Sequence, residues 1–453
     1  MGIIKSRVMA QNELKSNELL IYTEFENINW VQYILDEFCR IEKANFLIKV
    51  NTFRGQFHEN TKAIYYLKGD RSDIFQIPES DFLKKNNIKI INFKEFQILD
   101  KSCSKLNYWI NFDLFWNIFF YIGRLNEFHI RKTGNRTRSY SFKTKMPKNF
   151  SWEIPHVNFL FKEFKKYIKN RFPRFKFEKS DKAILELSHD LDYIEKTPIL
   201  ILKQSVFNGF NFIKRPNIEF LSRSIKFITS KSNYWNFDYW QDIEKEYNLK
   251  SIFYVYSKVK WGIKQSIFDP YYDVTKNKKL IEKLQEIKKN GWQIGLHGSF
   301  YSYKNFDLLK SEKTQLEEEL KIKITKNRQH WLNYDELLTP KIHEELFEVD
   351  STIGWNDRIG FRASIASKYR PYNHLQNKPY NFFVIPQAIM DSNIYDYGYG
   401  EEDDIINKSI DIINICKKLK NTEFSISWHS RTCSNDYKWS PGYIQMMKTF
   451  SSY

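Results

Sequence analysis

Four side chains in the second half of the chain combine residue types that suit a metal-dependent hydrolase: Asp190, Asp192, His297 and His429. Asp190 and Asp192 are two residues apart, so in an extended chain they point to the same side. One carboxylate of such a pair can bind a divalent metal while the other acts on the water that the metal activates. All four lie at or just after the end of an apolar run that predicts a strand, and these runs cover 183–187, 292–296 and 424–428.

The segments between these runs alternate between strand and helix. A strand is predicted at 251–256 after a helix at 239–247, and apolar residues at helical spacing predict helices at 278–290 and 305–320. Such alternation favours a parallel α/β sheet or barrel, in which the carboxyl ends of the strands form the active-site face. The basic, aromatic stretch 205–233 interrupts the alternation, and we interpret it as an insertion.

The first part of the chain predicts a smaller α/β domain. The elements expected there are strands at 19–22, 63–67 and 88–91, a helix at 30–39 and a buried helix at 112–128. A strongly basic segment with a central proline, 165–182, predicts the boundary that follows. We therefore expect an N-terminal accessory domain over residues 1–175 and a catalytic domain over residues 176–453.

The charge of the chain narrows its partners without selecting one. The formal net charge is +17 over 453 residues, and a basic surface attracts nucleic acid, anionic lipid or acidic glycans. Scattered, solvated lysines are an equally good explanation. No Gly-rich phosphate loop and no recognised nucleic-acid-binding motif is present, so nucleotide chemistry has no support and nucleic acid is disfavoured as a partner.

Cysteine usage and hydropathy indicate the compartment. The four cysteines are far apart and show no C-x-x-C spacing, which argues against a disulfide framework or a zinc–thiolate site. No cleavable signal peptide is visible, and the longest apolar stretch, 112–123, is too short and too polar to span a bilayer. We expect a cytoplasmic protein with reduced thiols.

Several segments, in order, resemble the motifs of the polysaccharide deacetylase superfamily (NodB homology, carbohydrate esterase family 4-like), in its bacterial subgroup with an extra N-terminal domain. They are Asp190–Asp192, Ile294–His297, Arg328–Leu332, Asp350–Thr352, Gly360–Ala363, Ile385–Asp391 and Trp428–His429. The resemblance covers residues 181–435. The segment 115–128, with Arg124 and Glu127, also resembles the N-terminal domain of that subgroup.

The resemblance implies a distorted (β/α) NodB-type barrel that removes acetyl from an acetylated amino sugar by metal-assisted amide hydrolysis. Asp192 and His297 would bind a divalent ion: Zn²⁺, with Co²⁺, Mn²⁺ and Ni²⁺ as alternatives. Asp190 would be the general base, and Arg328 would keep it ionised. His429, oriented by Asp391, would protonate the leaving amine.

One position departs from the family pattern. The second metal-binding histidine normally lies four residues after the first, and here that position is Tyr301. We predict that His330 replaces it, with Tyr301 and Ser302 as weaker candidates. If nothing replaces it, the metal is weakly held. The alternative function is therefore a weak or inactive protein on a deacetylase fold that binds glycan or a partner protein.

The expected partner is an acetylated amino-sugar glycan or a lipid-linked sugar. Aromatic faces suit pyranose rings, and four aromatic residues are either sugar-stacking or core residues: Tyr193, Trp331, Trp355 and Trp428. The positive charge is compatible with peripheral contact with an anionic membrane. That contact would place the enzyme at the inner membrane surface during synthesis of an envelope or capsule polysaccharide.

Overall fold

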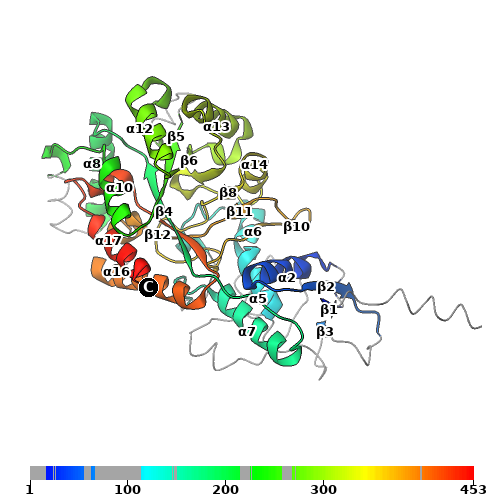
Figure 1. Ribbon diagram of the computed structural model, residues 1–453. Helices are drawn as coiled ribbons and strands as arrows, with labels where there is room; N and C mark the ends of the chain where they lie inside the picture. The colour runs from blue at the N-terminus through cyan, green and yellow to red at the C-terminus, as the bar shows by residue number, and fades with distance from the viewer. Residues whose placement is uncertain are drawn as a thin grey trace, which may run out of the picture.

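An eight-stranded parallel sheet forms the larger part of the protein (Figure 1). The computed structural model describes residues 17–23, 25, 27–55, 63–66, 114–144, 146, 150–214, 225, 227–257, 268–270, 272–397 and 400–452. The strands, in spatial order, are β11 (Phe383–Val384), β8 (Val349–Asp350), β7 (Lys326–Gln329), β6 (Gln293–Gly298), β5 (Ile252–Tyr256), β4 (Ile184–Leu191), β13 (Glu423–Ser427) and β12 (Gln387–Met390). Each neighbouring pair is parallel.

The two edge strands of this sheet are brought together by the chain itself. β11 ends at Val384 and β12 begins at Gln387, so only two residues separate the opposite edges. Three Cα–Cα steps reach at most about 11 Å. The sheet must therefore curl until its edges are close, which gives an incomplete barrel. The predicted α/β class with a distorted (β/α) barrel is confirmed by this topology.

Helices connect the parallel strands, as crossover connections require. The helices between strands are α8 (Pro198–Lys214), α10 (Phe237–Glu246), α12 (Lys278–Lys289), α13 (Phe306–Leu320), α14 (Thr339–Leu346), α15 (Asp391–Tyr395) and α16 (Glu402–Leu419). Helix α17 (Ser440–Ser451) follows β13, the last strand in the sequence. The side chains of Asn277 and Asn305 accept hydrogen bonds from the first turns of α12 and α13, which fixes where these helices begin. Both helices match the prediction within one residue. No helix among the described residues has the length and apolar character needed to cross a bilayer.

The N-terminal part contains a second, three-stranded parallel sheet in the order β2-β1-β3. Its elements are β1 (Glu18–Thr23), α2 (Asn29–Glu42), β2 (Leu47–Thr52), β3 (Ala63–Tyr66), α5 (Leu114–Ile122), α6 (Leu125–Lys132) and α7 (His156–Arg171). The single helix predicted at 112–128 is wrong: the chain breaks at Gly123 and Arg124, and Arg124 has a left-handed φ of 53°. The strand predicted at 88–91 lies outside the described residues.

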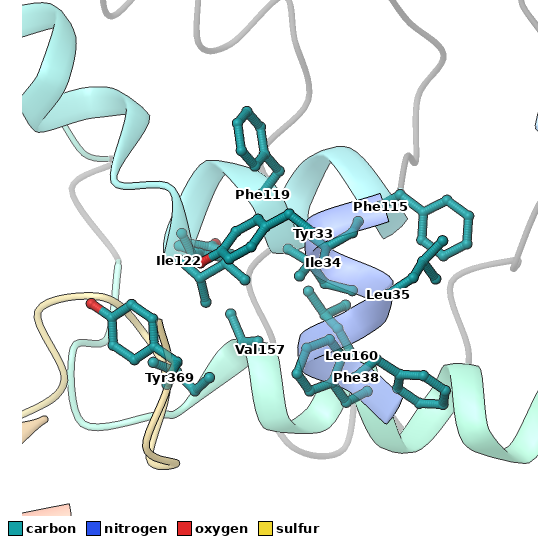
Figure 2. Close-up of a cluster of buried hydrophobic side chains, with 14 of the residues drawn as sticks. Tyr33, Ile34, Leu35, Phe38, Phe115, Phe119, Ile122, Val157, Leu160 and Tyr369 are labelled. Atoms are coloured by element: carbon teal, nitrogen blue, oxygen red, sulfur yellow. The ribbon is translucent and has the colours of Figure 1, made fainter. Parts of the chain in front are cut away.

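One hydrophobic core joins the N-terminal part to the barrel. Figure 2 shows side chains of α2, α5 and α7 pointing toward one another, with Tyr369 from the second half of the chain beside them. The same cluster includes Trp355 and Val384, the last residue of barrel strand β11. The boundary predicted near residue 175 separates the two sheets in sequence and stays a prediction, because no interruption of the core marks it.

A buried ion-pair network lies at the same junction. Glu127 on α6 accepts hydrogen bonds from Arg124 at 2.8 Å and from Arg362 at 2.6 Å, and Arg124 also donates to Glu336 at 2.8 Å. Burial raises the pKa of Glu127, but Arg124 and Arg362 lower it by more, so that the pKa is about 2. The carboxylate therefore stays charged, and both arginines remain paired within the interior, as buried charges require.

A close approach between the backbones of Gly360 and Trp152 predicts a measurable loss of stability on substitution. Gly360 has φ +115°, and a Cβ there would lie 2.4 Å from the carbonyl oxygen of Trp152. Gly134 has φ +85° with nothing within 4 Å of its Cβ position, so it is a matched control. Gly360→Ala should lower the free energy of unfolding by about 1–3 kcal/mol more than Gly134→Ala in urea denaturation. Equal losses would show that only backbone strain, and no backbone contact, operates at Gly360.

Candidate active site

The predicted site residues meet at the carboxyl ends of the barrel strands. Asp190 lies near the end of β4 with Asp192 just beyond it, and His297 lies on β6. His330 follows β7 and His429 follows β13. All but His429, which is part-buried, have less than one tenth of their surface exposed. Parallel strands end on one side of a sheet, which is why residues up to 239 positions apart converge here.

Asp192, His297 and His330 form a compact donor cluster. One ligand atom from each lies within 4.8 Å of the others. Oδ1 of Asp192 is 3.3 Å from Nε2 of His297 and 3.6 Å from Nε2 of His330. Among the described residues, neither Asp192 Oδ1 nor His297 Nε2 has a hydrogen-bond partner, although both atoms are buried. One carboxylate and two imidazoles fit a Zn²⁺-type cation.

Each imidazole is oriented by a contact on its other nitrogen. Nδ1 of His297 lies 2.9 Å from the carbonyl oxygen of Arg328, and Nδ1 of His330 lies 3.1 Å from Oδ1 of Asp269. A carbonyl or carboxylate can only accept here, so both Nδ1 atoms carry the proton and both Nε2 atoms face the cluster. Asp269 was not predicted from the sequence, since it belongs to no recognised motif.

The two weaker ligand candidates have other contacts. The Ser302 hydroxyl donates to the carbonyl oxygen of Ser299 at 2.9 Å and lies 3.1 Å from Oε1 of Gln329. The ring of Tyr301 packs edge-on against Phe268 and Phe300. The arrangement therefore suits His330 as the replacement ligand better than either of these residues.

Asp190 is held by a fully buried arginine. Arg328 donates to Oδ1 of Asp190 at 2.7 Å, and its side chain is 0% exposed. Burial raises the pKa of Asp190, but Arg328 and the imidazoles of His297 and His429 lower it by more, so the net shift is downward. Asp190 is therefore an ionised carboxylate beside the donor cluster, and an ionised carboxylate can accept a proton.

His429 is paired with Asp391, which follows β12. Nδ1 of His429 lies 2.7 Å from Oδ1 of Asp391, and the backbone N–H of His429 donates to Oδ2 at 2.8 Å. Nε2 faces Oδ2 of Asp192 at 3.3 Å. Burial lowers the pKa of His429, but Asp391 and Asp192 raise it by more, to about 9. The imidazole is thus protonated at neutral pH and can donate a proton.

Arg431 is a site residue that sequence reasoning missed. It donates to Oδ2 of Asp192 at 3.0 Å, and its guanidinium lies 5.3 Å from the ring centre of Tyr193. Burial raises the pKa of Asp192, while His429, His330 and also Arg431 lower it, leaving it well below its usual range. The only signal in the sequence was that Arg431 lies two residues after His429.

The loop that carries His330 is fixed by hydrogen bonds from the N-terminal part of the chain and from Asn356. Trp331 and Leu332 have left-handed φ values of 60° and 48°, a conformation that costs non-glycine residues about 1–2 kcal/mol each. The Ser139 hydroxyl donates to the carbonyl oxygen of Leu332. Asn356 donates to that of Trp331 at 2.9 Å, and Arg136 donates to the side chain of Asn333 at 2.7 Å. These bonds hold a strained loop at the metal cluster.

The aromatic candidates divide by exposure. Trp355 is 2% exposed and Trp428 is 0% exposed, so a sugar-stacking role for these two is wrong, and both are core residues. Trp331, in contrast, is 41% exposed on the loop beside His330. Tyr193 is partly exposed beside Arg431. Trp331 and Tyr193 therefore remain available to contact a ligand at the site.

Comparison with known proteins returned structures but no sequence relatives. No family model and no curated protein matches the chain. Among solved structures, one described as a polysaccharide deacetylase from Mycobacterium smegmatis is 15% identical, with 61% of this chain and 85% of that chain covered and a TM-score of 0.37. One from Pseudomonas aeruginosa PAO1 with the same description is 13% identical, with 60% and 84% covered and a TM-score of 0.35. A carbohydrate esterase family 4 pseudoenzyme from Bacillus anthracis is 9% identical, with 60% and 62% covered and a TM-score of 0.29.

The descriptions of these structures name the same family whose motifs this sequence resembles. All these TM-scores are below 0.5.

The contact between Asp269 and His330 predicts a change in metal affinity. Asp269→Asn removes the charged acceptor that orients His330, and loss of such a partner typically weakens metal binding about 10–100-fold. Competition with a chelator should therefore give a Zn²⁺ dissociation constant raised by this factor. Asp307→Asn, on the exposed side of α13, should leave it unchanged. Unaltered affinity in Asp269→Asn would mean that the contact with Asp269 does not support a metal ligand.

Proposed function

We propose that the protein is a metal-dependent carbohydrate N-deacetylase. The observation that carries the proposal is the presence of an ionised carboxylate and a protonated imidazole beside one cluster of metal-ligand atoms. Asp190 is kept ionised by Arg328, His429 is kept protonated by Asp391, and Asp192 lies within reach of both histidines of the cluster and of His429. Amide hydrolysis needs a base, an acid and an activated carbonyl at one place; Asp190 and His429 suit the first two roles, and an ion held by the donor cluster would activate the carbonyl.

Each residue has a step that its environment suits. Asp192, His297 and His330 would hold the divalent ion, with Zn²⁺ as the first choice for one carboxylate and two imidazoles. When bound, such an ion supplies Lewis-acid activation of the acetamido carbonyl and of the attacking water. Asp190 accepts the proton of that water. His429 gives its Nε2 proton to the leaving amine, and Asp391 stabilises the imidazolium until that transfer.

The proposed substrate is an acetylated amino sugar of an envelope or capsule polysaccharide, or its lipid-linked precursor. The exposed indole of Trp331 beside His330 supports a pyranose ring at the cluster, because aromatic faces stack on the apolar faces of sugars. The products would be a free amino sugar and acetate. A cytoplasmic protein working at the inner membrane surface would suit the lipid-linked precursor.

One observation favours a second candidate, an inactive protein that binds glycan or a partner protein. Oδ2 of Asp192 is already paired with Arg431 at 3.0 Å and lies 3.3 Å from His429. Two cations therefore compensate this carboxylate and compete electrostatically with a divalent ion. Metal content distinguishes the two candidates. If the purified protein takes up no Zn²⁺, Co²⁺, Mn²⁺ or Ni²⁺ on reconstitution but binds acetylated oligosaccharide, it is the inactive binding protein.

The base assignment predicts a loss of turnover without loss of metal. Asp190→Asn should reduce acetate release from an N-acetylglucosamine oligosaccharide by about 10²–10⁴-fold, since it removes the proton acceptor. Zn²⁺ content, measured by atomic emission, should be kept because Asp190 is not in the ligand set. Asp404→Asn on the exposed side of α16 should behave as the wild type. Full activity in Asp190→Asn would exclude the mechanism.

The acid assignment predicts a shift in the pH profile. The pKa of His429 is raised above its ordinary value to about 9, so the acid form is lost, and activity falls, as pH rises through that value. Asp391→Asn removes a contact that raises this pKa, so the alkaline limb of kcat should move to lower pH by about one to three units. Turnover measured from about pH 6 to pH 10 tests this. An alkaline limb that stays in place would assign it to another group.

A further inference from the structure

The outer face of α8 carries an exposed aliphatic stripe. Ile199, Leu202, Val206 and Ile213 are 41%, 67%, 66% and 78% exposed. Their spacings of three, four and seven residues place them within about 60° of one another around a helix with 3.6 residues per turn. We define these four residues as the α8 stripe.

At its N-terminal end, α8 also buries apolar side chains on the face opposite the stripe. Leu200 is 3% exposed and clusters with Phe227 and Tyr234. A helix on the surface of a globular protein normally exposes its polar face once its apolar face is buried. α8 exposes a second apolar face instead. Of the fourteen large hydrophobic side chains that are exposed among the described residues, six lie in the short stretch 199–228, so the exposure is concentrated at one place.

The sequence around the stripe is basic. Residues 198–233 contain six Lys or Arg and a single Glu, within a chain of net charge +17. An exposed apolar stripe on a helix, within a stretch that carries five more basic than acidic side chains, is typical of helices that lie in the plane of a membrane interface, with the apolar face among the acyl chains. Anionic headgroups complement the surrounding charge, at about 1 kcal/mol for each basic residue near the surface.

α8 borders the candidate active site. The Lys203 ammonium donates to the carbonyl oxygen of Asp269, the residue that orients His330. Tyr193 and Tyr437 pack against the cluster that contains Leu200 of α8, and their rings lie 5.3 and 5.6 Å from the Arg431 guanidinium. In Figure 1, α8 lies at the edge of the molecule on the side away from the N-terminal sheet. A surface that receives the stripe therefore lies near the metal cluster.

We propose that the α8 stripe docks the protein on an anionic phospholipid surface. The aliphatic side chains enter the interface, and anionic headgroups complement the net positive charge of the sequence 198–233. Docking places the site beside the headgroups, where an amino sugar carried on a lipid would be reached. This last point rests on the proposed deacetylase function, whereas docking itself does not.

Vesicle binding by the full chain tests the docking. The wild type should co-sediment with vesicles of phosphatidylcholine and phosphatidylglycerol, and binding should fall as salt is raised. A double variant of the stripe, Leu202→Gln with Val206→Gln, should bind at least about tenfold more weakly, because two aliphatic side chains no longer enter the interface. The matched control is Leu47→Gln with Leu375→Gln, two leucines that are 66% and 55% exposed outside α8. It should bind as the wild type does.

Three results would overturn the docking proposal. The first is a wild type that does not bind the anionic vesicles, or binds pure phosphatidylcholine equally well. The second is a stripe variant that binds like the wild type. The third is a stripe variant that only dissociates a dimer in analytical ultracentrifugation, which would make a second copy the occupant.

Acetate release from a soluble oligosaccharide should be equal in the wild type and the stripe variant. This second readout separates failure of docking from failure of the proposed deacetylase function.

Discussion

Both the barrel and the site depend on the hydrogen bonds of the buried Arg328 guanidinium. Its hydrogen-bond partners come from three other barrel segments: Asp190 and Ser188 on β4, Ser425 and Ser427 on β13, and Ser351 after β8. A cation with no solvent exposure is tolerated only when it is paired and its donors are satisfied. The ring of small hydroxyl residues meets this requirement and leaves room for the arginine inside the barrel. The structure that stabilises Arg328 is thus the same structure that keeps Asp190 ionised.

The charges around Asp192 follow from that arrangement. Because Arg328 compensates the charge of Asp190, Asp192 is the carboxylate left to face His297, His330, His429 and Arg431. Its Oδ1 points to the two histidines and has no hydrogen bond among the described residues, whereas its Oδ2 is paired with Arg431. The carboxylate therefore has one side suited to a metal and one side already compensated. Metal affinity is decided by the balance between these two sides.

Hydrophobic periodicity predicts the long helices and apolar strands, and the order of the motifs predicts which residues form the site. Long amphipathic helices such as α12 and the apolar strands β5 and β6 were identified nearly to the residue, because their burial pattern is local. β8 and β11 are two residues long, and β7 reads Lys-Asn-Arg-Gln, so neither apolar content nor alternation could reveal them. His330 could be proposed from its motif. Asp269 and Arg431 could not, since their roles arise from contacts made only in the folded chain.

The N-terminal part is best understood as a component of the site. Trp331 and Leu332 hold a backbone conformation that is unfavourable by itself, so it persists only where surrounding contacts impose it. Those contacts include Ser139, which also accepts a hydrogen bond from Arg362 at 2.6 Å. Arg362 in turn is bound to Glu127 on α6. Segments that are far apart in the sequence are therefore connected by direct contacts. The buried ion pairs fix Ser139, and Ser139 fixes the loop that presents His330.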